Sequence, residues 1–354
     1  MTDRLAEYRR KRDAARTPEP IPDSAEPAAA TEDRFVIQQH HARSLHWDVR
    51  LERSGVLVSF AVPRGLPRDQ GRNNLAKHTE DHPLEYLDFS GEIPAGEYGG
   101  GRMTIFDRGT YETGKWRDDE IGVTFHGDRT NGRYVFFQTG GNDWMVRRMD
   151  PPEPGWESMP ETVAPMLPVA ARSLPAEHED AEWGYELAWG GRRVVAYVSG
   201  GRVRLLDADG EDVTSWYPEV RPLGPALAPT EAVLDGEIVT LPDPAQLERR
   251  KAPKDAAAAK RAAERTPVYY LAYDLLWLEG HSTVEALRYA ERRELLEGLS
   301  INGDHWQTPP YFPGGSQFAL EAATAQGLGG VVAKRLDSPY LPGRRSRLWL
   351  AVSS

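Results

Sequence analysis

Two histidines and an aspartate lie close together in the string QQHHARSLHWDVRLE near the start of the chain. They are His40, His46 and Asp48, and Arg50 follows two positions later. Two imidazoles and one carboxylate make a three-ligand metal site with open positions, of a kind that suits manganese, zinc or iron. The guanidinium of Arg50 would add a two-pronged donor for an anion such as phosphate.

The local pattern predicts the elements that would bring these side chains together. Alternate residues of a strand share one face, so His46, Asp48 and Arg50 would point the same way. Residues 41–45 are enough to turn the preceding strand back, which places His40 beside His46. The same alternation also fits the plain polar outer face of a half-buried hairpin, and spacing alone leaves both interpretations open.

A second string, EDHPLEYLDFSGEIPAGEYGGG at residues 80–101, adds polar groups of the same kind. Its Glu80, His82 and Tyr86 precede a glycine-rich turn that can approach a ligand closely. An imidazole and a phenol can hold or protonate a phosphoryl oxygen. We therefore expect this segment to complete the site of the first string.

Composition limits the chemistry further. The chain has no cysteine, so thiolate metal sites, disulfides and cysteine nucleophiles are excluded, and any metal must use His, Asp, Glu or water. There is neither an apolar run near 18 residues nor a secretory signal, which predicts a cytoplasmic protein without a membrane partner. The net charge is −11, but residues 35–150 are nearly neutral and residues 151–354 carry −8 of it. That distribution weighs against a broad nucleic-acid surface on the second half.

The chain divides into an arm and two globular regions. Residues 1–34 begin with a charged helix-like stretch and continue as a Pro/Ala-rich arm. Residues 35–150 predict a mostly β small barrel or sandwich, residues 151–163 a Pro-rich linker, and residues 164–354 an α+β domain. Within the last region, helices are expected over roughly 245–265, 284–298 and 316–326, the first of which also fits a mobile insert.

Residues 8–150 resemble the 3′-phosphoesterase domain of bacterial DNA ligase D, an end-joining enzyme. The matching strings are RDAARTPEP, FVIQQHHARSLHWDVRLE, VSFAVPRG, EDHPLEY and GEIPAGEYGGG, in the same order. In that family a divalent metal, typically manganese, is held by two His and one Asp. The resemblance therefore implies a manganese site, or one for zinc or cobalt, on His40, His46 and Asp48.

The resemblance also assigns roles to other residues. It implies phosphate contacts from Arg50, His82 and Tyr86. It makes the arm part of the active site, because Arg12, Asp13 and Glu19 match family residues there. Gln38 and Glu80 match as well, whereas Arg64 stands where the family has Lys, and Asn74 where it has Arg. We take Asp13, Glu19 and Glu80 as catalytic candidates, and Arg12, Gln38, Arg64 and Asn74 as substrate-binding candidates.

The activity implied for this half is trimming of nucleic-acid 3′ ends in DNA repair. A terminal ribonucleoside would leave by phosphodiester hydrolysis, and the remaining 3′-phosphate by monoester hydrolysis. The expected partners are DNA primer–templates with such ends, and a DNA-end-binding repair protein.

Residues 164–354 resemble the nucleotidyltransferase-like adenylation domain of ATP-dependent DNA ligases. The matching strings are PMLP, YELAWGGRR, VLDGEIV, LAYDLLWLEG and GGVVAKRLDSPYLPGRRSRLWL. The family's nucleophilic Lys is Ala188 in this chain, and its neighbouring Asp is Gly190. Its later Glu is Gly329, and its two final Lys are Ala351 and Ser353. An alanine methyl group forms no phosphoramidate, so we expect neither ATP use nor ligation. We also expect no oligonucleotide-binding domain after this region.

Three other hypotheses compete with a 3′-phosphoesterase. The departures at Arg64 and Asn74 keep open a non-catalytic end-joining scaffold that binds DNA or repair proteins. Two His and a carboxylate also serve non-haem iron oxygenases, although the adjacent Arg50 and the EDHPLEY string disfavour that class. An active ligase would require a nucleophile that Ala188 does not provide.

Overall fold

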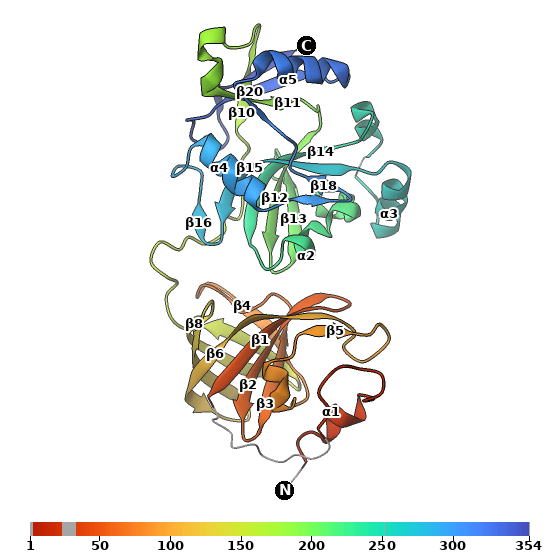
Figure 1. The fold of residues 1–354 in the computed structure, drawn as a ribbon, viewed down its shortest axis with the longest axis vertical. Coiled ribbons are helices and arrows are strands. Elements are labelled where there is room, and N and C mark those ends of the chain that lie inside the picture. The colour runs from red at the N-terminus through yellow and green to blue at the C-terminus, as the bar shows by residue number, and fades with distance from the viewer. Residues whose placement is uncertain (1–2, 23–32, 251, 354) are drawn as a thin grey trace. The chain divides into compact units, whose positions relative to one another are not determined.

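The computed structural model describes residues 3–22, 33–250 and 252–353. The chain forms two compact units, Met1–Pro154 and Gly155–Ser354, and each is considered by itself (Figure 1). The middle of the expected Pro/Ala-rich arm, residues 23–32, lies outside the described residues.

The first unit is a closed antiparallel barrel of eight strands. The strands follow the order β1-β2-β3-β4-β9-β8-β7-β6, and β1 closes the ring by pairing with β6. The short β5 also pairs with β6 but is not one of the eight ring strands. The strands are β1 (Arg34–His41), β2 (Leu45–Arg53), β3 (Val56–Val62), β4 (Asn73–His78), β5 (Gly91–Ile93), β6 (Gly101–Trp116), β7 (Glu120–Gly127), β8 (Asn131–Gly140) and β9 (Asp143–Arg148).

Aromatic side chains fill the inside of this barrel. Phe35 of β1 meets Phe125 of β7 with ring centroids 4.7 Å apart, and Phe60 of β3 stacks on Phe136 of β8 at 4.8 Å. Both contacts join strands that are not neighbours in the ring, so these side chains point inward. Because side chains alternate along a strand, the β1 residues at alternate positions after Phe35, namely Val36, Gln38 and His40, point to the outside of the barrel.

The outer face of β1 and β2 is covered rather than exposed to solvent. The helix α1 (Ala6–Arg10) and the 3₁₀ turn Leu84–Leu87 lie against it, as Figure 1 shows for α1. Tyr8 of α1 and Tyr86 of the turn pack with Val36 of β1 in one buried cluster. The hairpin is therefore buried on both faces, which overturns the idea of a half-buried hairpin with a solvated polar face.

The second unit is built on two sheets. A five-stranded sheet has the order β10-β21-β20-β11-β19, and a seven-stranded sheet runs β13-β12-β14-β15-β18-β17, with β16 paired to β15. Their strands are β10 (Leu167–Ala171), β11 (Trp183–Leu187), β12 (Arg192–Ser199), β13 (Arg202–Asp207), β14 (Ala232–Val239), β15 (Tyr269–Leu278), β16 (His281–Ser282), β17 (Asn302–Gly303), β18 (Trp306–Gln307), β19 (Phe312–Pro313), β20 (Gly330–Arg335) and β21 (Arg345–Ser353).

Helices cover these sheets, and an aromatic cluster joins them. The helices are α2 (Leu223–Leu227), α3 (Ala256–Arg265), α4 (Tyr289–Gly298) and α5 (Ser316–Ala325), with 3₁₀ turns at Glu177–Glu182, Thr214–Trp216, Pro218–Val220 and Pro244–Arg249. Helix α5 packs Ala319 and Ala323 on the five-stranded sheet. Trp349 of β21 lies in one core cluster with Tyr197 of β12 and Trp277 of β15. The expected α+β class fits this architecture.

Several boundaries differ from the sequence expectation. The region 245–265 is a 3₁₀ turn and then α3, and the buried Arg250 between them pairs with Glu219 at 2.5 Å, so the segment packs on the unit. Helix α4 begins at Tyr289 rather than at 284. The units divide at Pro154/Gly155, inside the proposed linker 151–163, and Trp156 and Val163 pack into the second unit.

In the described ranges, no helix combines the length and apolar character needed to cross a membrane.

The glycine-rich turn before β6 leads to the first testable prediction. Gly101 has a φ of +145°, and a Cβ there would lie 2.3 Å from the carbonyl oxygen of His41. We expect Gly101→Ala to push β6 away from β1 and to lower the free energy of unfolding by about 2 kcal/mol, as measured by denaturant titration.

Gly96 provides the matched control, because its φ is +98° and a Cβ there would meet nothing within 4 Å. Gly96→Ala carries the backbone strain without the collision, so it should cost less. Equal losses in the two variants would contradict the close approach of β1 and β6 as the cause.

Candidate active site

The register of β1 and β2 brings the three predicted metal ligands together. His40 pairs directly with His46, and Gln38 with Asp48. His40 Nδ1 lies 3.4 Å from Asp48 Oδ2, and His46 Nε2 lies 3.6 Å from Asp48 Oδ1. Within the described residues this is the one group of three or more His, Asp or Glu side chains whose ligand atoms all lie within 4.8 Å of one another.

Backbone carbonyl groups hold both imidazoles in one orientation. His40 Nε2 lies 2.8 Å from the carbonyl oxygen of Gly99, and His46 Nδ1 lies 2.9 Å from that of Ser44. A carbonyl oxygen only accepts, so each of these nitrogens is protonated and donates. The other nitrogen of each ring faces Asp48, so it is the atom that would bind a metal, and a metal-binding histidine is oriented in this way.

Asp48 is kept ionised next to these rings. Burial alone would raise its pKa, but the Arg50 guanidinium and the two imidazoles outweigh that effect and hold the pKa well below its usual range. Arg50 Nη2 donates to Asp48 Oδ2 at 3.0 Å. A deprotonated carboxylate and two imidazole lone pairs form a donor set that fits a divalent cation such as manganese, zinc or cobalt.

Hydrogen bonds from all three nitrogens of the guanidinium hold Arg50 in place. Its Nε donates to Gln38 Oε1 at 2.7 Å and its Nη1 to Ser59 Oγ at 3.0 Å, and the residue is 2% exposed. Gln38 in turn donates to the carbonyl oxygens of Tyr86 and Phe89. In the described ranges the side-chain bonds of Arg50 use three of the five N–H groups of a guanidinium, which leaves one on each Nη atom for an anion.

His82 and Tyr86 lie beside Arg50. The Arg50 guanidinium lies 4.7 Å from the centroid of the Tyr86 ring, and the rings of His82 and Tyr86 are 4.8 Å apart. Burial, with Arg50 and Arg12 nearby, lowers the pKa of His82 well below its ordinary value, so the ring is neutral. Its Nδ1 donates to the Glu80 carbonyl oxygen at 2.8 Å, and Nε2 is therefore an acceptor.

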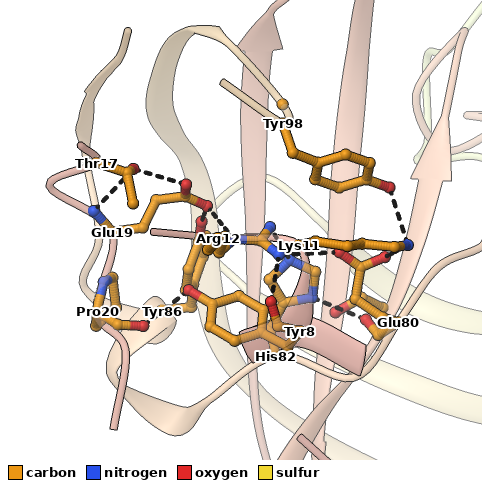
Figure 2. Close-up of polar contacts among 12 residues, drawn as sticks. Tyr8, Lys11, Arg12, Thr17, Glu19, Pro20, Glu80, His82, Tyr86 and Tyr98 are labelled. Atoms are coloured by element: carbon orange, nitrogen blue, oxygen red, sulfur yellow. Dashed lines mark hydrogen bonds and ion pairs between the residues drawn. The ribbon is translucent and has the colours of Figure 1, made fainter. Parts of the chain in front are cut away.

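The arm adds charged groups to this wall of the site, as Figure 2 shows. Arg12 donates through Nε to Glu19 at 2.6 Å and through Nη1 to Glu80 at 3.1 Å, and its Nη2 lies 3.4 Å from His82 Nε2. Tyr86 donates its hydroxyl to the buried Glu19. Five residues predicted from the second string and the arm thus meet in one network.

Three of the predicted residues are not joined to that network by a side-chain contact. Asp13 is exposed, and its carboxylate accepts from the backbone N–H of Ala15. Arg64 is exposed as well. Asn74 is buried and donates to the carbonyl oxygen of Gly65 at 2.8 Å, so its amide holds the loop that carries Arg64.

Sequence reasoning missed several residues that hold the site. Tyr8 is fully buried, donates to the Pro20 carbonyl oxygen at 2.7 Å, and packs its ring 5.1 Å from that of His82. Lys11 forms an ion pair with Glu80 at 3.0 Å. Neither Lys11 nor the Gly99 carbonyl carries a signal in the sequence that would identify it.

In the second unit, the positions at which the sequence departs from the ligase pattern lie near one end of the five-stranded sheet. The backbone N–H of Ala188 donates to the Gly330 carbonyl oxygen at 2.9 Å, and Gly330 pairs with Ser353. Val332 pairs with both Glu186 and Ala351. Gly190 and Gly329 are exposed next to these strands.

Charged residues remain buried next to that end of the sheet. Lys334 Nζ lies 2.7 Å from Glu186 Oε2 and 4.1 Å from the centroid of the Trp349 ring. Glu186 also accepts from the Tyr289 hydroxyl at 2.6 Å. Burial lowers the pKa of Lys334, although Glu186 acts in the opposite direction.

Both regions of the chain match families of known proteins. Residues 38–138 match the family described as DNA Ligase D 3'-phosphoesterase domain, and residues 165–352 match the ATP dependent DNA ligase domain. The chain is 43% identical over 366 residues to the multifunctional non-homologous end joining protein LigD of Mycolicibacterium smegmatis, covering 99% of this chain and 45% of that protein. It is 31% identical over 410 residues to the LigD of Pseudomonas aeruginosa, covering 98% and 47%.

A solved structure, mycobacterial DNA ligase D complexed with ATP and MES, is 35% identical with a TM-score of 0.47, covering 55% of this chain and 60% of that chain. The chain spans about half the length of the curated LigD relatives it matches. The ligase-domain match alone covers more than half of the chain, and the phosphoesterase match precedes it. The chain therefore belongs to the ATP-dependent DNA ligase domain family and carries in front of that domain the 3′-phosphoesterase domain of DNA ligase D.

Proposed function

We propose that the first unit is a metal-dependent 3′-phosphoesterase that trims nucleic-acid 3′ ends, removing a terminal ribonucleoside and then the remaining 3′-phosphate. One observation carries the proposal. The carbonyl contacts of His40 and His46 aim the other nitrogen of each ring at the ionised Asp48, directly beside the Arg50 guanidinium. A cation site next to an anion site is what phosphoryl transfer requires.

The metal would be held by His40, His46 and Asp48. When bound, a divalent cation supplies charge that polarises the phosphoryl oxygen and offsets the negative charge of the transition state. Manganese, zinc and cobalt all accept this donor set, and the proposal includes all three.

The protein's own groups would do the rest. Arg50 would bind two phosphoryl oxygens through its two remaining N–H groups, and its three hydrogen-bond partners hold it in place during the reaction. The neutral His82 would orient the attacking water by accepting a hydrogen bond at Nε2, in place of the 3.4 Å contact with Arg12 Nη2. Tyr86 and the arm residues Arg12 and Glu19 would exclude bulk water from this wall of the site.

For Asp13, Arg64 and Asn74 we propose supporting roles nearer the substrate strand. Asp13 and Arg64 are exposed, so they are accessible to a nucleic-acid backbone. Asn74 would act through the Gly65 carbonyl by holding the loop on which Arg64 lies.

For the second unit we propose a role without adenylation. The absence of a nucleophile at Ala188 removes the covalent step, and Gly190, Gly329, Ala351 and Ser353 lack the charged groups that would hold a triphosphate. A binding role toward DNA or an end-binding repair protein remains the proposed use of this unit.

The metal site yields the second prediction. His40→Ala and Asp48→Ala should each reduce phosphate release from a 3′-phosphate primer–template by about 100-fold or more, since even groups that merely orient a ligand contribute 10- to 100-fold. Manganese binding, measured by calorimetry, should be lost in the same variants. A chelator should abolish wild-type activity, and manganese should restore it.

His41→Ala is the matched control, because His41 is the neighbouring imidazole on the opposite face of β1 and hydrogen-bonds with Gln39 at 2.9 Å. It should keep both metal binding and turnover. Metal binding by the wild-type chain without any phosphate or nucleoside release would instead favour the non-catalytic end-joining scaffold.

The third prediction concerns the Arg50 fork. Arg50→Lys keeps the positive charge but loses the planar pair of donors, so kcat should fall by about 100- to 1,000-fold. Manganese affinity should change far less, which separates this loss from damage to the metal site. A variant with near wild-type kcat would show that Arg50 serves Asp48 alone.

The fourth prediction tests the second unit. Incubation of the wild-type chain with ATP labelled at the α-phosphate should give no labelled protein. Ala188→Lys should give none either, because the other four positions still lack their charged side chains. A labelled adduct of the wild-type chain would overturn the proposal that this unit does not adenylate.

A further inference from the structure

One large aromatic side chain is exposed at the edge of the candidate site. Tyr98 is 47% exposed and belongs to the glycine-rich turn between β5 and β6. Most of the other aromatic residues near the site, Tyr8 and Tyr86 among them, are buried. An exposed aromatic ring beside a cluster of buried polar side chains is a candidate contact surface for a ligand.

The backbone of Tyr98 is tied directly to the metal-ligand side of the site. The next residue, Gly99, accepts the hydrogen bond of His40 at 2.8 Å. Gly100 and Gly101 leave no room for a Cβ, which would lie 2.8 Å from the Pro94 oxygen and 2.3 Å from the His41 oxygen. The turn is therefore packed closely, and the position of Tyr98 is set by the same contacts that set His40.

The ring of Tyr98 is held from the arm. Lys11 Nζ lies 3.3 Å from its hydroxyl and 4.7 Å from the ring centroid, and the Arg12 guanidinium lies 5.4 Å from that centroid. Lys11 is in turn anchored on Glu80, as Figure 2 shows. Two cations thus lie over the ring while about half of the residue remains accessible to solvent.

This ring has contacts toward both parts of the candidate site. The residue directly after it, Gly99, carries the carbonyl that orients His40, and Arg12 connects the ring to His82, whose Nε2 is 3.4 Å from the guanidinium. A phosphate bound at Arg50 and His82 carries a nucleoside one sugar away. A flat, rigid and partly open ring at the rim of an anion site matches the flat face of a base.

We propose that Tyr98 is a stacking platform for the nucleobase of the 3′-terminal nucleotide, and that it sets the preference for a nucleoside-bearing phosphate over a phosphate alone. The inference rests on the proposed 3′-phosphoesterase function and adds a substrate contact to it. Stacking on an aromatic face is largely independent of base identity, so this contact would let one site accept ends of any sequence.

The test compares Tyr98→Leu with Tyr98→Phe in the full chain. The first substrate is a primer–template whose strand ends in a 3′-phosphorylated 2-aminopurine nucleotide, and the second is identical but has an abasic terminal residue. For Tyr98→Leu we expect KM to rise about tenfold or more on the first substrate, with kcat within about twofold, and KM to stay unchanged on the abasic one. Tyr98→Phe should resemble the wild type, since the phenyl ring still stacks.

Met149→Ala is the matched control for removing an exposed apolar side chain. Met149 is 40% exposed and follows β9, which is four strands from β1 in either direction around the barrel. This variant should leave KM unchanged on both substrates. Equal losses of Tyr98→Leu on the two substrates, or no loss on either, would overturn the stacking role.

Binding without turnover separates this inference from the proposed function. The fluorescence of the terminal 2-aminopurine is followed while wild-type chain is added without metal, so no hydrolysis is needed. Quenching that disappears in Tyr98→Leu and persists in Tyr98→Phe supports stacking even if the wild type releases no phosphate. Equal quenching in all three chains would refute it, whatever the activity.

Discussion

The pairing register of β1 with β2 is the constraint on which the rest of the candidate site depends. Because side chains alternate with a period of two, a slip of one residue would turn His46, Asp48 and Arg50 into the barrel and expose Trp47 and Val49. The observed register pairs His40 with His46 directly. It is enforced from both sides, since aromatic packing fills the inside of the barrel and the arm covers the outside. The metal ligands thus occupy their places because the alternative would cost much of the core.

The second constraint is that each buried charge must be paired with an opposite charge. Arg12, Glu19 and Glu80 each have side chains less than 5% exposed, and an unpaired charge at such a depth is strongly unfavourable. Each is paired with another, and the arm supplies one partner in every pair. Removing the arm would therefore leave Glu80 and Tyr86 without Arg12 and Glu19, which explains why a segment with little secondary structure of its own is part of the wall around His82.

Sequence reasoning predicted that His40, His46 and Asp48 lie together, because period-two alternation and a short turn leave little freedom in a hairpin. It predicted the hairpin of β1 and β2 and a mostly β region for the same reason, but not the closure of the ring, because pairings such as that of β4 with β9 join distant segments. It had no means to find the carbonyl groups of Gly99 and Ser44 that fix the imidazole tautomers, because every residue has a carbonyl. The burial of the polar face of the hairpin also depends on the distant arm, so the pattern of β1 and β2 alone left it open.

The cost of an unpaired buried charge also bears on whether the second unit uses ATP. Glu186 and Lys334 match positions of the ligase pattern, and their presence looks like a reason to expect nucleotide chemistry. Both are nearly fully buried and lie 2.7 Å apart. Deleting one member of such a pair strands the other and typically costs about 3–5 kcal/mol, so folding alone requires both. Ala188, Gly190 and Gly329 have no charged partner that folding would require, since they are partly or fully exposed and bear no charge. The charged residues that remain in this unit are therefore those the fold itself needs, and they carry no independent argument for adenylation.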